Sequence, residues 1–131
     1  MNLLNPNVSA NELHGISTLA LAHIGDGVYE LMTRTRLCFD GSPTAKKLHA
    51  ATVSQVNASS QAIAARTLQQ HFTQEESAVF RRGRNAKSVV PKSASPEDYQ
   101  LATALEAVFG YLFLTGNVDR LNELMDIIHP C

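Results

Sequence analysis

The chain has 131 residues, of which 44% are hydrophobic and 18% are charged, and its formal net charge is -1. A chain of this length can bury one hydrophobic core without disulfides, so we expect a single domain over residues 1–131. A net charge so close to zero indicates no particular partner, and only a local cluster of charge could do that.

The cysteines and the N-terminal segment bear on the compartment. Cys38 and Cys131 stand singly and form no CxxC pair or zinc-ligand spacing, which favours a reduced cytoplasmic protein. The first arginine is Arg34, so no basic segment precedes an apolar one near Met1 and a secretory signal is not expected. The most apolar window, AVFGYLFL, is shorter than the roughly 20 residues that cross a bilayer. We therefore expect no membrane partner.

Two helices are predicted in the first half of the chain. Apolar residues recur at helical spacing over 13–37, and the segment FDGSP at 39–43 ends that helix. Ser42 as N-cap with Pro43 in the first turn predicts a second helix that reaches about His71.

The middle of the chain predicts a short helix followed by a loop. TQEE at 73–76 is a capping-box pattern ahead of a short helix through Phe80. Residues 81–96 lack periodicity and are expected to form a basic loop, with its charges over about 81–95.

Two further helices complete an all-α fold of five or so helices. SPED at 95–98, with Pro96 in the first turn, predicts a helix that runs to about Thr115 and is stopped by Gly116. A last amphipathic helix is predicted over 118–128. We see no strand alternation, internal repeat or second domain.

The first predicted helix carries an isolated carboxylate. Asp26 lies between Gly25 and Gly27 and is the only formally charged residue between Glu12 and Glu30. Small neighbours would let another helix or a ligand approach closely. The alternative is an Asp that bonds backbone groups where the glycines loosen the helix. A buried ionised Asp is costly unless a cation or several donors meet it.

A second isolated carboxylate lies in the most apolar helix. Glu106 is the only formally charged residue between Asp98 and Asp119, so we expect it to be largely desolvated, with a raised pKa. Sharing a divalent cation with another carboxylate would keep it ionised. The alternative is a buried ion pair with an arginine, for which the candidates are Arg34, Arg36 and Arg66.

Two such carboxylates suggest a site for a hard metal ion. Mg²⁺ takes oxygen ligands, keeps several waters and often needs only one or two protein carboxylates. Spacing alone does not show that Asp26 and Glu106 converge. The histidines form no HxxxH pair, which disfavours zinc, and there is no GxxxxGK[ST] loop for a nucleotide.

The segment RRGRNAKSVVPK at 81–92 concentrates positive charge. It holds five basic residues of the chain's 11 and no acid. Arginine forks and a mobile lysine suit phosphates, whereas the ordinary alternative is a solvated face. Aromatic residues are not interleaved, which argues against stacking on single strands and favours the backbone of a duplex. The basic residues are Arg81, Arg82, Arg84, Lys87 and Lys92.

LALAHIGDGVYE, RRGRNAKS and TALEAVFGYLFL, in this order, resemble the catalytic domain of ribonuclease III over about residues 13–116. The chain looks most like the Mini-ribonuclease III form, which lacks the appended double-stranded-RNA-binding domain. The resemblance identifies Asp26 and Glu106 as the catalytic metal ligands. Ala22 and Thr103 stand where larger enzymes have acids, and Leu19 also replaces an acidic position.

The resemblance implies a homodimer with one site per subunit and a valley for duplex RNA. It implies Mg²⁺-dependent hydrolysis of double-stranded RNA, with Mn²⁺ able to replace Mg²⁺, in maturation of the large-subunit (23S) ribosomal RNA precursor. The five basic residues would bind phosphates, and Asn85 and Ser88 would contact phosphates or 2′-hydroxyls.

Two other functions remain open on the sequence. Ala22 and Thr103 also suit a dimeric RNA-binding or scaffold protein of this fold that has lost catalysis. Retention of both Asp26 and Glu106 counts against that alternative. A purely structural helical module for protein–protein contacts is the third possibility.

Overall fold

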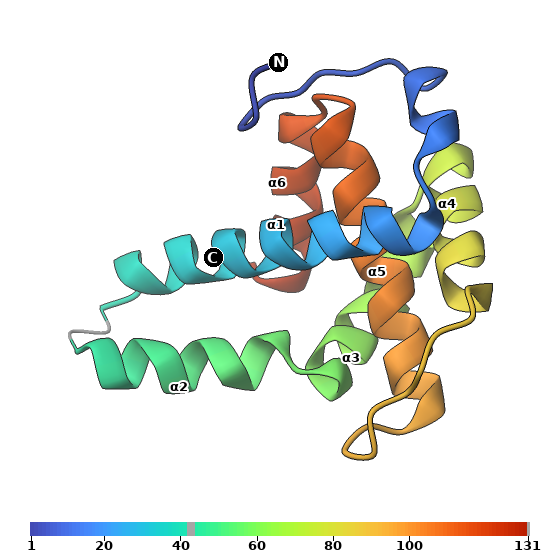
Figure 1. Ribbon diagram of the computed structural model, residues 1–131. Coiled ribbons are helices and arrows are strands. Elements are labelled where there is room, and N and C mark those ends of the chain that lie inside the picture. The colour runs from blue at the N-terminus through green and yellow to red at the C-terminus, as the bar shows by residue number, and fades with distance from the viewer. Residues whose placement is uncertain (42–43, 131) are drawn as a thin grey trace.

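The computed structural model describes residues 1–41 and 44–130, and all regular structure in this part of the chain is helical (Figure 1). The all-α prediction is confirmed. No helix among these residues is long and apolar enough to span a bilayer. The helices are η1 (Glu12–Gly15), α1 (Thr18–Phe39), α2 (Ala45–Val56), α3 (Ala58–Leu68), η2 (Gln69–His71), α4 (Gln74–Asn85), α5 (Pro96–Leu114) and α6 (Val118–Ile128).

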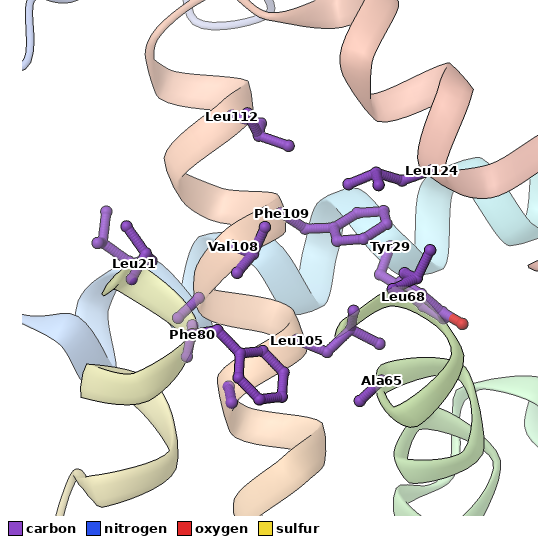
Figure 2. Close-up of a cluster of buried hydrophobic side chains, with 14 of the residues drawn as sticks. Leu21, Tyr29, Ala65, Leu68, Phe80, Leu105, Val108, Phe109, Leu112 and Leu124 are labelled. Atoms are coloured by element: carbon purple, nitrogen blue, oxygen red, sulfur yellow. The ribbon is translucent and has the colours of Figure 1, made fainter. Parts of the chain in front are cut away.

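Helix α5 is the centre of the fold and packs against α1, α3, α4 and α6. It is apolar on nearly every side, as expected for a helix enclosed by others. Figure 2 shows Phe109 beside Leu124 of α6 and Tyr29 of α1. The rings of Tyr29 and Phe109 meet edge to face with centroids 5.1 Å apart.

The backbones of α1 and α5 touch where the helices cross. A Cβ atom added at Gly25 would lie 1.6 Å from the carbonyl oxygen of Glu106, and one added at Gly110 would lie 1.9 Å from that of Leu21. Only glycine permits this approach. Gly27 has open space around it, so the predicted close approach applies to Gly25 alone.

The first half of the chain differs from the predicted two helices. Ser17 caps α1 by accepting from the backbone N–H of Ala20, so the helix begins later than predicted and η1 precedes it. The predicted second helix is two helices, because Asn57 is extended (φ -73, ψ 160) and its side chain caps α3. Thr44 caps α2, whereas the predicted cap residues 42 and 43 lie outside the described part.

The predicted loop over 81–96 is wrong in its first part. The capping box at Thr73 and Glu76 is confirmed, but α4 continues to Asn85. Gly83 does not break the helix because it faces α5, where an added Cβ would lie 2.8 Å from the Cα of Ala104. The irregular segment is therefore 86–95.

The last two helices match their predictions. Ser95 caps α5 with Pro96 in the first turn. Gly116 follows α5 with a φ of +78, the left-handed conformation that favours glycine, and α6 covers 118–128.

Candidate active site

Asp26 and Glu106 meet at the crossing of α1 and α5. They line one hollow of about 200 Å³. The crossing at Gly25 brings them together, because Asp26 follows that glycine and the Glu106 backbone lies against it. The other residues that line the hollow are Leu19, Ala22 and His23 from α1 and Tyr99 and Thr103 from α5.

Each helix presents one face to this hollow. On α5, Tyr99, Thr103 and Glu106 are spaced four and three residues apart, which places them on one face. His23 and Asp26 are three apart on α1, so they also share a face. Asp26 is exposed and Glu106 is half-buried, so the pair opens toward solvent through Asp26.

The Glu106 carboxyl is held in its protonated form near neutral pH. Burial raises the pKa of Glu106 to about 8, and a hydrogen bond and charge repulsion from Asp26 add to the effect. The side-chain amide of Gln61 on α3 lowers this pKa, but by less. A cation placed between the two carboxyl groups would reverse the balance and favour the ionised form.

The predicted alternative, a buried ion pair of Glu106 with an arginine, is wrong. Arg34 pairs with Glu30 at 3.2 Å, and Arg36 pairs with Asp40 at 3.0 Å. The third candidate, Arg66, reaches Glu97 and Asp98 at the start of α5. None of the ion pairs among the described residues includes Asp26 or Glu106.

The donor set fits a magnesium ion that keeps most of its waters. Within residues 1–41 and 44–130, no group of three or more His, Cys, Asp or Glu side chains is placed to hold a metal. Mg²⁺ needs only one or two carboxylates, and an oxygen-only pair suits it better than it suits zinc. Ala22 and Thr103 also line the hollow, but they are buried and add no carboxylate.

Sequence reasoning missed two polar contributors to this site, His23 and Gln61, whereas Thr103 was singled out by its position. Thr103 donates its hydroxyl to the carbonyl of Tyr99 at 2.9 Å, so it is satisfied within α5. His23 lines the hollow, and its position three residues before Asp26 was a usable signal. Gln61 comes from α3, and nothing in the sequence connects it with Glu106.

The basic segment, defined as Arg81, Arg82, Arg84, Lys87 and Lys92, is exposed throughout. In the described part of the chain, none of its residues forms an ion pair with an acid. Its members face different ways, because Arg81, Arg82 and Arg84 belong to α4 and the lysines to the irregular segment.

Part of the basic segment gathers around one hollow beside the first half of α5. One hollow of about 390 Å³ is lined by Arg84, Asn85, Lys87 and Ser88 together with Gln100 of α5. Gln100 is the neighbour of Tyr99, which lines the acidic hollow. Arg82 faces a separate hollow beside α1, and Lys92 lines neither. The structure thus brings four of the seven predicted RNA-contact residues together.

Comparison with known proteins places these features in a family. Residues 19–117 match the model of the ribonuclease III domain. A Mini-ribonuclease 3 from Clostridium tetani is 39% identical over 95% of this chain and 84% of its own length. One from Gloeobacter violaceus is 45% identical over 92% and 85%. A crystal structure of a Fusobacterium nucleatum protein superposes with a TM-score of 0.81 and 26% identity, covering 89% of this chain and 94% of that one.

Proposed function

Because this chain belongs to the ribonuclease III family and is an endoribonuclease of the Mini-ribonuclease 3 type, we propose that it cuts double-stranded RNA with a magnesium ion held by Asp26 and Glu106. The observation that carries the proposal is the convergence of these two isolated carboxyl groups in one hollow, where no arginine neutralises them. Mn²⁺ would serve in place of Mg²⁺, since both accept oxygen ligands.

Asp26 and Glu106 share one part in the proposed reaction, which is to hold the metal ion. Bound Mg²⁺ supplies Lewis-acid polarisation of the scissile phosphate and a water of lowered pKa. Asp26 and Glu106 hold the ion directly or through its waters, and Glu106 gives up its proton on binding. Hydrolysis by water needs no protein nucleophile, which agrees with a hollow that no serine, cysteine or lysine of the described residues lines.

The basic segment would supply affinity for the duplex. Its exposed, unpaired cations can neutralise strand phosphates, which gives binding that weakens with salt and carries little base specificity. Asn85 and Ser88 share a hollow with Arg84 and Lys87, so their side chains suit phosphate or 2′-hydroxyl contacts.

The proposal includes a homodimer in which each subunit cuts one strand. Large apolar side chains are exposed on α1, α2 and α3, where they would be costly in a monomer. Figure 1 shows the second half of α1 and α2 extending away from the rest of the molecule. The exposed apolar residues of these helices are Leu31 and Phe39 on α1, Val53 on α2 and Ile63 on α3. Sedimentation at several protein concentrations tests the dimer.

The proposed substrate is duplex RNA of the 23S ribosomal RNA precursor. A cleavage assay on a plain RNA duplex and on such a precursor, with and without Mg²⁺, tests this together with the mechanism. We expect cutting only with the metal, and Asp26→Asn to bind RNA without cutting it. Cleavage at full rate by Asp26→Asn would sink the assignment of the site.

The same assay distinguishes the second candidate, a scaffold that binds duplex RNA without cutting it. Ala22 and Thr103, which add no acid to the site, are the observations in its favour. Binding without cutting by the unaltered chain, in Mg²⁺ and in Mn²⁺, would establish it.

A further inference from the structure

Gln61 is a buried amide with no hydrogen-bond partner for its nitrogen. It lies at the end of the first turn of α3, and only 3% of the residue is exposed. Its Nε2 atom is fully enclosed and no donor–acceptor contact satisfies it among the described residues. A buried N–H group without a partner costs free energy, so its retention in a core position calls for a reason.

The face of α3 that carries Gln61 is otherwise apolar. Ala65 and Leu68 follow at four and seven residues, and both are fully buried. Figure 2 shows these two side chains near Leu105 of α5. Gln61 thus occupies a position of the α3–α5 contact where packing alone would favour an alanine or leucine.

The neighbour of Leu105 along α5 is Glu106, and the side-chain amide of Gln61 lies within reach of that carboxyl group. Asp26 approaches the same carboxyl from α1. Glu106 therefore has a carboxyl group on one side and an amide donor on another. Protein groups that hydrogen-bond a metal-binding carboxylate fix its orientation, and their loss weakens metal binding roughly 10- to 100-fold.

We infer that Gln61 is a positioning residue for the metal site: its Nε2–H donates to the Glu106 carboxylate and orients that group toward a cation shared with Asp26. The inference rests on the proposed function, because it takes Asp26 and Glu106 as the metal ligands. It explains why a buried amide without a partner persists in the metal-free fold. The donor is in place for the carboxyl group that would bind the cation.

The experiment measures Mn²⁺ binding by the electron paramagnetic resonance signal of the free ion, with the whole chain and no RNA. Gln61→Met keeps the length of the side chain and removes the donor. Gln55→Met is the control, since Gln55 is a half-buried amide on α2 that accepts a hydrogen bond from Arg36 and has no contact with the acidic pair among the described hydrogen bonds. Glu106→Gln removes the ligand itself.

We expect Gln61→Met to raise the Mn²⁺ Kd about tenfold or more while its melting temperature stays equal or rises. In cleavage, the half-saturating Mg²⁺ concentration should rise, and kcat at saturating Mg²⁺ should return close to that of the unaltered chain. Gln55→Met should leave the Mn²⁺ Kd unchanged. Gln61→Asn keeps the amide on a side chain that is one methylene shorter, and it should also weaken Mn²⁺ binding. This second variant keeps the inference testable if Gln61→Met fails to fold.

Two results separate the inference from the function beneath it. If Gln61→Met or Gln61→Asn leaves the Mn²⁺ Kd unchanged while Glu106→Gln abolishes Mn²⁺ binding, the proposed role of Gln61 alone is overturned. Gln61 is then a packing residue. Equal Mn²⁺ binding by the unaltered chain and Glu106→Gln overturns the proposed metal site, and the role of Gln61 with it.

Discussion

Two glutamates of this molecule are both shielded from water, but their pKa values shift in opposite directions. Burial raises the pKa of Glu76, but the paired hydrogen bonds from Arg120, at 2.9 Å each, and the backbone N–H of Thr73 outweigh it, so the net shift is downward. Glu106 meets another carboxyl group where Glu76 meets a guanidinium, and its pKa rises to about 8.

The difference teaches that burial alone does not distinguish a structural carboxylate from a functional one. Glu76 is satisfied by groups of its own fold, and Arg120 also donates to the carbonyl of His71, so the cluster joins α4, η2 and α6. Glu106 is left unsatisfied as an anion. A carboxyl group whose charge the fold does not balance is a candidate to bind a cation.

The largest expected effect is on cleavage by Glu106→Gln. Loss of a metal ligand should lower the rate on the order of a thousandfold or more. The free energy of unfolding should hold or rise, because a strained acid becomes a neutral amide. Single-turnover cleavage of a duplex and urea denaturation measure the two quantities. A drop in stability with cleavage intact would reverse the roles assigned to the two glutamates.

Glu76→Gln should show the opposite pattern. Removing the buried partner leaves Arg120 paired only with the exposed Glu123 among the described residues, and should lower the free energy of unfolding by roughly 3 kcal/mol. Cleavage well below the melting temperature should persist, since Glu76 lines no part of the acidic hollow. Urea denaturation checks the first statement and a cleavage assay at low temperature the second.

The two glutamates should also give opposite dependence of stability on pH. The folded chain keeps the Glu106 proton up to a pKa of about 8, whereas the unfolded chain releases it near the ordinary glutamate pKa of 4.5. Stability without metal should therefore fall as pH rises through this window, by up to about 1.4 kcal/mol per unit. Because the pKa of Glu76 is lowered in the folded chain, its protonation should reduce stability only as pH falls below the ordinary glutamate pKa.

Denaturation across this pH range, with and without Mg²⁺, tests the contrast. Glu106→Gln should remove the decline at higher pH, and Mg²⁺ should reduce it in the unaltered chain. A decline of equal size in Glu106→Gln would point to another group.

The smallest expected effect compares arginines with and without acidic partners. Arg82→Gln with Arg84→Gln should weaken duplex binding and reduce the salt slope by about 2, because two phosphate contacts are lost. Arg34→Gln with Arg66→Gln removes the same charge from residues that are already paired, and should change the slope less. Filter binding in the Glu106→Gln background measures binding without cleavage. Equal salt slopes for both pairs of variants would show that the arginines of α4 bind no phosphates and form only a solvated face.

Local signals predicted the fold where they were complete. Ser95, Pro96 and Gly116 mark both ends of α5, and the structure places them as expected. Asn57 was missed because helix-compatible residues surround it on both sides. Gly83 was misread as part of a loop because its contact with Ala104 depends on tertiary packing.

The two carboxyl groups of the candidate site could be singled out from the sequence, and their surroundings could not. Asp26 and Glu106 stand out as lone charges in apolar helices, so their isolation is visible in the sequence. That Arg34, Arg36 and Arg66 are engaged elsewhere follows only from the folded arrangement. The position of Gln61 depends on the packing of α3 against α5, which no spacing in the sequence reveals.

The glycine crossing of α1 and α5 has a consequence for the choice of cation. Because the backbones of α1 and α5 already touch at Gly25 and Gly110, these helices cannot move closer together to coordinate a smaller ion in the proposed site. Adjustment to ionic radius is left to rotation of the Asp26 and Glu106 side chains. In the proposed metal site, discrimination between cations of similar charge then depends on these two side chains and the waters between them, because the separation of the helices is fixed.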